Sequence, residues 1–115
     1  MHIYFAGIGG VGVGPLAAIA KEAGYKVSGY DISSSPMTEK LAEKSIPIAI
    51  GDGLPAITAA HKKQPIDWLV ATAAIAKNDP ILQFAHDHNI RMSKRDELIN
   101  QLVKEHPSAN VAFRI

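Results

Sequence analysis

Short apolar runs alternate along the chain with longer stretches in which apolar residues recur every three or four positions. The continuous apolar run 3–6, closed by Gly7, predicts a strand buried on both faces. Helical spacing from 11 to 23 predicts a helix, with Gly24 placed to end it. The same pattern predicts strands at 26–32, 46–50, 67–71, 90–92 and 110–115, helices at 37–44, 54–61, 80–88 and 94–104, and a surface loop at 62–65.

Strands that alternate with helices in this way indicate right-handed βαβ units and a parallel sheet. The expected fold class is α/β, a Rossmann-like, doubly wound three-layer domain with about five parallel strands. In such a fold, ligands bind at the carboxyl ends of the strands, near the point where the strand order reverses beside the first strand. The 115 residues are enough for one domain.

The composition mainly excludes certain partners and types of site. The chain has 12 Lys and Arg against 11 Asp and Glu, a net charge of +1, which gives no reason to expect nucleic acid or an anionic membrane as partner. It has no Cys, which excludes disulfides, thiolate metal sites and a Cys nucleophile. No stretch reaches the ~20 apolar residues of a membrane span. The amino-terminal residues resemble a strand rather than a signal peptide, so the cytoplasm is the expected compartment.

The most informative motif is a Gly-rich turn. Residues 7–12 read Gly-Ile-Gly-Gly-Val-Gly, directly after a predicted strand and directly before a predicted helix. Gly9 would let the backbone approach a phosphate, and Gly12 would let the helix pack close to the strand. The N–H groups at the helix start would then face an anion. The motif predicts a nucleotide diphosphate site without saying which nucleotide; a Gly-rich turn without a ligand is the alternative.

Polar residues follow the second predicted strand. Asp31 ends it, in the place where dinucleotide-binding folds carry an acid that bonds the adenosine ribose. It could equally hold another sugar hydroxyl or cap the next turn. Ser33, Ser34 and Ser35 are candidates either for ligand contacts or for helix capping.

A second constellation follows the fourth strand and precedes the last helix. Thr72 offers a hydroxyl among small residues, Lys77 could reach a phosphate, and Arg95 is expected at another strand end. An ordinary loop and a solvated helix start are the alternatives. His86 and His88 are expected on different faces of a helix, so no metal site is predicted, and no catalytic residue is identified.

Five motifs in this order resemble the N-terminal domain of the Mur ligases, nearly end to end. They are Tyr-Phe-Ala-Gly-Ile-Gly-Gly-Val-Gly at 4–12, Gly-Tyr-Lys-Val-Ser-Gly-Tyr-Asp at 24–31, Pro-Ile-Ala-Ile-Gly at 47–51, Ala-Thr-Ala-Ala-Ile with Asn-Asp-Pro within 71–80, and Ser-Lys-Arg-Asp-Glu-Leu at 93–98. The chain is most similar to members that add L-alanine to UDP-N-acetylmuramate in peptidoglycan precursor synthesis. It departs from them at Asp52, where His is frequent, and at Gly14-Pro15, where Ser-Gly is usual.

The resemblance implies a role for each candidate residue. The UDP sugar would be held with its diphosphate on the N–H groups of Gly9, Gly10, Val11 and Gly12. Arg95 would contact the ligand or tie down the Gly-rich turn. Uridine and ribose would be surrounded by Asp31, Ser33, Gly51, Asp52, Thr72, Ala73, Ala74 and Ile75.

The resemblance also implies a division of the chain. Residues 1–108 would form the UDP-sugar-binding domain, and 109–115 would begin a central domain that binds ATP with magnesium. The phosphate loop of that domain, similar to Gly-Thr-His-Gly-Lys-Thr, is not in the sequence, so this chain is expected to be inactive alone and to bind no cofactor. Three alternatives stay open: an NAD(H)-binding module, the first domain of the ligase that recycles murein tripeptide, and an interaction domain without a ligand.

Overall fold

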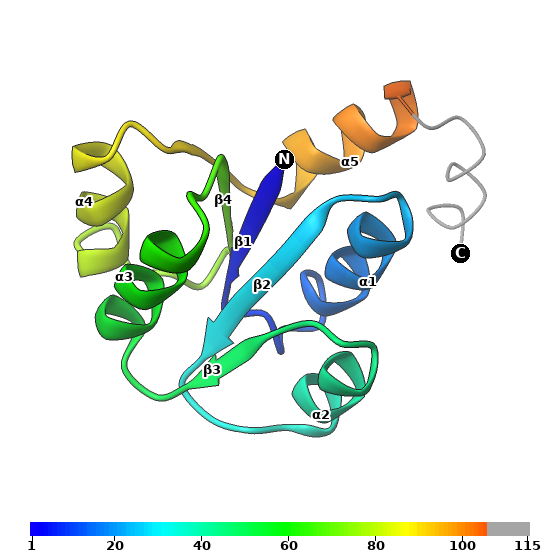
Figure 1. Cartoon of the computed structure of the whole chain (residues 1–115), viewed down its shortest axis with the longest axis horizontal. Coiled ribbons are helices and arrows are strands. Elements are labelled where there is room, and N and C mark those ends of the chain that lie inside the picture. Colours follow the sequence, from blue (N-terminus) through cyan, green and yellow to red (C-terminus); the bar gives the residue numbers. More distant parts are fainter. Residues whose placement is uncertain (106–115) are drawn as a thin grey trace.

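The computed structural model describes residues 1–105 and contains a single sheet of five parallel strands (Figure 1). The strands are β1 (His2–Ala6), β2 (Lys26–Asp31), β3 (Ile48–Ile50), β4 (Trp68–Ala71) and β5 (Arg91–Ser93). Their order in the sheet is β3-β2-β1-β4-β5. Chain order therefore runs outward from β1 in both directions, and the reversal lies between β1 and β4. The predicted strand at 110–115 and the expected boundary at 108 lie outside the described residues.

Helices cover both faces of the sheet (Figure 1). One face carries α1 (Gly14–Glu22), α2 (Pro36–Glu43) and α5 (Arg95–Glu105), and the other carries α3 (Gly53–Lys63) and α4 (Pro80–Asp87). This is the α/β, Rossmann-like three-layer arrangement that the sequence predicts. No helix within residues 1–105 is both long enough and apolar enough to cross a membrane.

Successive side chains of the central strand β1 point to opposite faces of the sheet and belong to two separate hydrophobic cores. Ile3 and Phe5 of β1 belong to the core under α1, α2 and α5, whereas Tyr4 and Ala6 belong to the core under α3 and α4. All four side chains are at most 1% exposed. A strand buried on both faces needs an uninterrupted apolar run, which is why 3–6 could be recognised from sequence.

Gly24 ends α1 as predicted. It has φ of +100°, which glycine adopts without the steric cost that a Cβ brings. Its N–H donates to the carbonyl of Lys21 at 3.0 Å, and the N–H of Tyr25 donates to the carbonyl of Ala20 at 3.2 Å. These are the two hydrogen bonds of a Schellman motif, and they satisfy carbonyls that the last turn leaves without partners.

Three of the predicted bounds differ from the structure by two residues or more, and the others differ by at most one. The first helix begins at Gly14 rather than at 11, because residues 11–13 form the end of the Gly-rich turn. The third strand begins at Ile48 rather than at Ile46, whose N–H instead donates to the carbonyl of Leu41 at the end of α2. The loop predicted at 62–65 is wrong in its first half, since α3 continues to Lys63; basic residues suit the carboxyl end of a helix dipole.

Candidate functional site

The Gly-rich turn between β1 and α1 is shaped by contacts with β2 and with the segment after β4. The N–H groups of Gly7 and Ile8 both donate to the carbonyl of Tyr30, at 2.9 and 3.0 Å. Gly7 has φ of +75°, and a Cβ there would lie 2.7 Å from Cγ2 of Thr72. Glycine is therefore needed at this position both for the backbone conformation and for the close approach of Thr72.

The four N–H groups expected to hold a diphosphate divide into two pairs. Gly9 donates to Oδ2 of Asp31 at 2.8 Å, and Gly10 donates within the turn at 2.9 Å. The N–H groups of Val11 and Gly12 have no hydrogen-bond partner within residues 1–105. They come just before α1, whose start has no side-chain cap. This second pair is placed to bind an anion.

A cleft of about 350 Å³ opens beside this free pair. Its lining brings together Gly12, Thr72, Ala73 and Arg95, four of the residues predicted from sequence. Nη1 of Arg95 lies 3.4 Å from the carbonyl oxygen of Gly12, to which it donates. The cleft lies where the chain leaves β1 and β4 in opposite directions, the usual ligand position in doubly wound sheets.

Lys94 is a candidate that sequence reasoning missed. It lines the same cleft as Arg95 and is exposed. Its sequence signal was its position directly after β5, at the carboxyl edge of the sheet. The two side chains bring two cations to the cleft beside the free N–H of Gly12. Asp96 also lines the cleft, and its Oδ1 lies 3.5 Å from Nε of Arg95, so it offsets part of this charge. The combination of cations and a free N–H suits a negatively charged group, such as a diphosphate.

The predicted stretch from Thr72 to Ile75 does not act as one unit. Thr72 and Ala73 line the cleft, whereas Ala74 is exposed and its N–H lies 3.5 Å from Oγ1 of Thr72. Ile75 packs against the core of α3 and α4 and lines an adjoining cleft of about 400 Å³, which shares Ala71 and Lys94 with the first. Lys77 is exposed and lines neither of these clefts.

The remaining predicted residues lie at the carboxyl ends of β2 and β3, outside the lining of the cleft. The N–H of Gly51 donates to the carbonyl of Asp31 at 2.9 Å, which holds these two strand ends together. Asp52 caps α3, with its Oδ1 accepting from the N–H of Leu54 at 3.3 Å. Ser33 is exposed. The assignment of this region to uridine and ribose stays a prediction.

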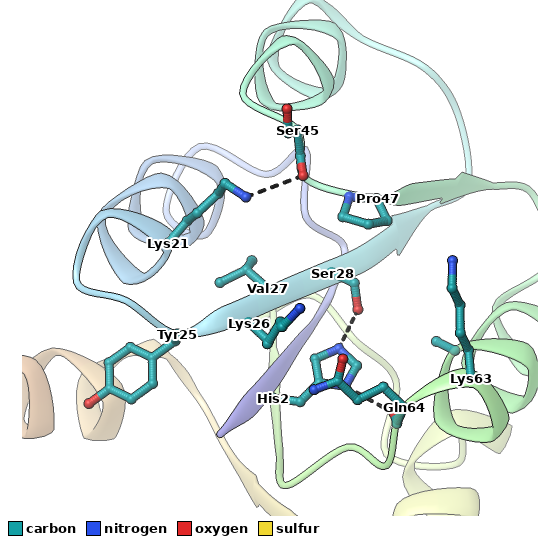
Figure 2. A pocket seen from close by; sticks show the side chains of 11 residues that line it. His2, Lys21, Tyr25, Lys26, Val27, Ser28, Ser45, Pro47, Lys63 and Gln64 are labelled. Atoms are coloured by element: carbon teal, nitrogen blue, oxygen red, sulfur yellow. Dashed lines mark hydrogen bonds between the residues drawn. The ribbon is translucent and has the colours of Figure 1, made fainter.

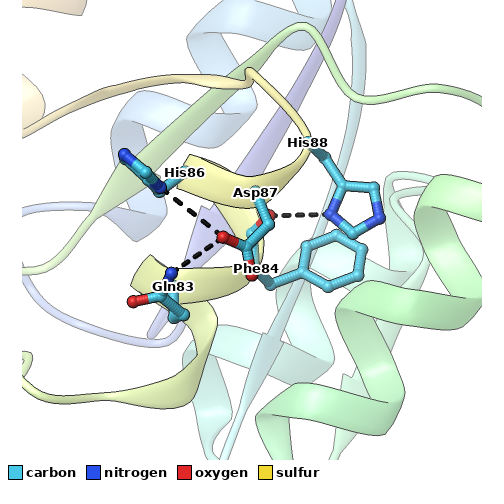
Figure 3. A network of polar contacts seen from close by, with 5 residues as sticks. All are labelled: Gln83, Phe84, His86, Asp87 and His88. Carbon is cyan, nitrogen blue, oxygen red and sulfur yellow. Dashed lines mark hydrogen bonds and ion pairs between the residues drawn. The ribbon is translucent and has the colours of Figure 1, made fainter.

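His86 in α4 and His88, directly after its end, make local contacts (Figure 3). Nδ1 of His86 lies 3.5 Å from Oδ1 of Asp87, which also accepts from Nε2 of Gln83 at 2.8 Å. The hydrogen bond from Gln83 is the main reason that the pKa of Asp87 is lowered. His88 donates from Nδ1 to the carbonyl of Phe84 at 2.8 Å. Within residues 1–105, no three His, Asp or Glu side chains are grouped to hold a metal ion.

Sequence comparison connects this geometry to known proteins. The model of the Mur ligase family, catalytic domain, matches residues 2–107. A UDP-N-acetylmuramate–L-alanine ligase of Clostridium botulinum is 39% identical over 106 residues, which are 90% of this chain and 21% of that protein. This chain thus spans about a fifth of the length of the curated relatives that it matches.

Solved structures have the same fold. The UDP-N-acetylmuramate:L-alanyl-gamma-D-glutamyl-meso-diaminopimelate ligase of Neisseria meningitidis superposes with a TM-score of 0.77 at 28% identity, over 91% of this chain and 32% of that one. The UDP-N-acetylmuramate–alanine ligase of Thermotoga maritima also superposes with a TM-score of 0.77, at 25% identity, over 91% of this chain and 23% of that one.

Proposed function

Because this chain belongs to the Mur ligase family, we propose that it holds UDP-N-acetylmuramate for an ATP-dependent ligase that adds L-alanine to this sugar nucleotide. Peptidoglycan precursor synthesis is the process that this reaction serves. The cytoplasmic location indicated by the sequence belongs to the same proposal.

One observation carries the proposal: the two free N–H groups of Val11 and Gly12 lie beside a cleft that also presents Lys94 and Arg95. Backbone N–H groups at a helix start bind phosphate oxygens, and two cations offset the charge of a diphosphate. The contribution of these residues is binding and orientation. By fixing the diphosphate, they would fix where the sugar of the ligand emerges from the cleft.

The described residues fit neither ATP nor magnesium. Residues 1–105 contain no group of three side chains suited to a metal ion, and the sequence has no phosphate loop of the Gly-Thr-His-Gly-Lys-Thr kind. Our proposal for residues 1–105 therefore concerns the UDP-sugar site.

The ligase that recycles murein tripeptide is the second candidate. It is favoured by the superposition on the Neisseria enzyme, whose name also includes UDP-N-acetylmuramate. The curated relatives favour the first candidate, because the Clostridium ligase is 39% identical to this chain. The solved structures do not separate the two candidates, at 28% identity for the Neisseria enzyme and 25% for the Thermotoga ligase. The pair Gly9-Gly10 agrees with this preference, because the turn of the recycling enzyme tends to carry Cys at the first of these positions.

The test is an amide-shift titration of the chain with UDP-N-acetylmuramate, UDP and NAD. We expect both uridine ligands to shift the amides of Val11, Gly12 and Thr72. NAD is the informative competitor, because an NAD(H)-binding module uses the same Gly-rich turn. Shifts with NAD and none with either uridine ligand would contradict the proposal.

A charge variant with a matched control locates the site. Arg95→Ala should weaken UDP binding about tenfold, because a hydrogen bond to a charged group is worth about 1.5–3 kcal/mol. Lys77→Ala removes an equally exposed cation that does not line the cleft, and should leave UDP binding unchanged. Equal losses for the two variants would point to a nonspecific charge effect and remove the cleft from the site.

A further inference from the structure

A further pocket, distinct from the cleft beside the Gly-rich turn, lies at the opposite end of the sheet, beside the amino-terminal half of β2 (Figure 2). It has a volume of about 300 Å³. Because β3 begins only at Ile48, which pairs with Gly29, the first residues of β2 have no strand next to them on this side. From Lys26 to Asp31 the strand rises about 17 Å in five steps of 3.3 Å, and the pocket lies at its start, away from the Gly-rich turn.

The pocket is strongly cationic. Lys21, Lys26 and Lys63 line it, and its lining includes no Asp or Glu. Nζ of Lys21 donates to the carbonyl of Ser45 at 3.3 Å, which holds one ammonium at the rim (Figure 2). The acidic residue Asp67 accepts the backbone N–H of His2 at 2.7 Å beside the pocket but does not line it. The pocket therefore favours an anion.

The floor of the pocket is a fixed polar pair (Figure 2). Nε2 of His2 lies 2.7 Å from Oγ of Ser28, and Nδ1 lies 3.1 Å from the carbonyl oxygen of Gln64. A carbonyl can only accept, so Nδ1 donates to Gln64, while Nε2 shares a hydrogen bond with the hydroxyl of Ser28. His2 is 5% exposed and Ser28 is 8% exposed, so this pair is buried, and both ring nitrogens of His2 already have partners.

One backbone donor also faces the pocket. Along a parallel strand, the N–H groups of successive residues point to opposite sides. The N–H of Lys26 donates toward β1, to the carbonyl of Met1, and the N–H of Gly29 donates the other way, to Pro47. Val27 shares the direction of Gly29 and lines the pocket. Its N–H has no hydrogen-bond partner within residues 1–105.

A hollow of about 260 Å³ adjoins this pocket and shares Ser28, Pro47, Ala60 and Lys63 with it. It runs along α3, where Ala56 and Ala59 give it an apolar wall.

Tyr4 lines this second hollow, is only 1% exposed, and has a hydroxyl without any hydrogen-bond partner within residues 1–105. Burial raises the pKa of Tyr4, so the hydroxyl keeps its proton. Buried donors without a partner are rare, so this hydroxyl is free to donate to a group that enters the hollow.

We propose that the two adjoining hollows form one binding site for a small phosphate monoester whose body is apolar and carries a hydrogen-bond acceptor. The three lysines and the N–H of Val27 hold the phosphate, which brings about two negative charges and three acceptor oxygens. The alanines of α3 contact the body of the ligand. The hydroxyl of Tyr4 donates to its acceptor.

The experiment uses three probes that differ by one feature each: inorganic phosphate, phenyl phosphate and 4-nitrophenyl phosphate. In amide-shift titrations of the chain, affinity should rise in that order, because the ring adds apolar contact and the nitro group adds an acceptor. The shifted amides should be those of Val27, Ser28 and Ala60. Shifts confined to Val11 and Gly12 would mean that the probes bind the Gly-rich turn instead, which overturns the proposal.

Charge variants test the phosphate position. The double substitution of Lys26→Gln and Lys63→Gln should weaken phenyl phosphate binding at least about tenfold, since each removes a charged hydrogen-bond donor. Lys62→Gln is the matched control, because Lys62 is the exposed neighbour of Lys63 on α3 and does not line the pocket. An equal effect of the control and the double variant would overturn the proposal.

Tyr4→Phe tests the acceptor position and keeps the fold intact. Removing an unpartnered buried hydroxyl should leave the thermal stability equal or higher. The variant should lower the affinity for 4-nitrophenyl phosphate about fivefold and leave that for phenyl phosphate unchanged, because only the nitro group reaches the hydroxyl. If the natural chain and the Tyr4→Phe variant each bound 4-nitrophenyl phosphate no more tightly than phenyl phosphate, the role of Tyr4 would be overturned. None of these measurements depends on UDP binding, so this proposal and the proposed function can fail separately.

Discussion

At the scale of single residues, the contact between Asp31 and Gly9 decides which side of the Gly-rich turn is open. The carboxylate of Asp31 accepts from the N–H of Gly9 and, through its other oxygen, from the N–H of Ile32, both at 2.8 Å. A negative charge therefore already occupies the side of the turn over β2. The free donors of Val11 and Gly12 are left for a ligand that approaches from the side of β4.

Gly9→Ala should destabilise the chain, because its Cβ would lie 2.6 Å from Oδ2 of Asp31 and 2.9 Å from Cγ2 of Thr38. Overpacking of this kind costs about 1–3 kcal/mol in the free energy of unfolding, measurable by urea denaturation. Gly12→Ala is the control. Its Cβ would meet mainly Nη1 of Arg95 at 3.0 Å, the end of a flexible side chain that can move away. A loss for Gly12→Ala as large as that for Gly9→Ala would contradict this account.

The hydrogen bond of Tyr25 leads us to expect that the stability of the chain depends on pH in the alkaline range. Its hydroxyl donates to Oε2 of Glu105 at 2.6 Å. Burial first, and then the hydrogen bond and the charge of Glu105, raise the pKa of Tyr25 to about 12 from 10.0. A pKa that is higher in the folded state contributes stability that is complete below pH 10 and is lost as the pH rises through 12.

The expected result is a smaller alkaline loss of stability in Tyr25→Phe than in the natural chain, measured by urea denaturation at pH 8 and pH 11. Both proteins contain the other tyrosines, so the contribution of these residues to the alkaline loss of stability cancels in the comparison. Parallel losses in both would show that Tyr25 does not ionise differently in the folded chain.

At the scale of elements, α2 shows how a polar run that could serve a ligand serves the helix instead. Ser35 is its N-cap, accepting from the N–H of Thr38 at 3.2 Å, while Oγ1 of Thr38 accepts from the N–H of Ser35 at 2.8 Å. This reciprocal pair is a capping box, followed by Pro36 at the first helical position. Of the three serines, one therefore has a structural role that needs no ligand.

Ser35→Ala should lower the free energy of unfolding by about 1 kcal/mol, the usual cost of losing an N-cap. Ser33→Ala is the matched control, since Ser33 is exposed and lies outside the capping box. Thermal denaturation of both variants checks the difference. If Ser33→Ala cost as much as Ser35→Ala, the capping box would not be the source of the loss.

The elements also show what the sequence could and could not predict. All five strands and five helices within residues 1–105 were predicted, because apolar runs and helical spacing are local signals. Their ends were less predictable: Ile46 has strand character, but its N–H closes α2.

Gly12, Thr72 and Arg95 were predicted separately, but their meeting in one cleft depends on strand order. The cleft also adds Lys94. The bond between Gly9 and Asp31 depends on a close approach that motif spacing does not specify.

At the scale of the whole molecule, the two cores lie back to back on one sheet and share its strands. Trp68 of β4 belongs to the core under α1, α2 and α5, while its neighbour Leu69 belongs to the other core. Loss of either layer of helices would expose alternate residues of the same strands. The two cores should therefore unfold together.

The prediction is that urea unfolding gives coincident curves by far-ultraviolet circular dichroism and by Trp68 fluorescence, which reports a side chain only 1% exposed. Ile57→Ala, on the face away from Trp68, should shift both curves equally, by about 2–5 kcal/mol. Leu102→Ala, in the core of Trp68, is the matched variant and should do the same. A fluorescence curve unaffected by Ile57→Ala would mean that the cores unfold independently.

The outermost strands of the sheet, β3 and β5, are only three residues long. An outer strand offers unpaired N–H and carbonyl groups to any other chain, and long flat ones template aggregation. Three residues provide too short a ladder for an incoming strand to gain much, and β3 is followed at once by Gly51, where φ of +123° turns the backbone away. We expect the shortness of these strands, together with the turn at Gly51, to limit pairing along the edges of the sheet at high concentration.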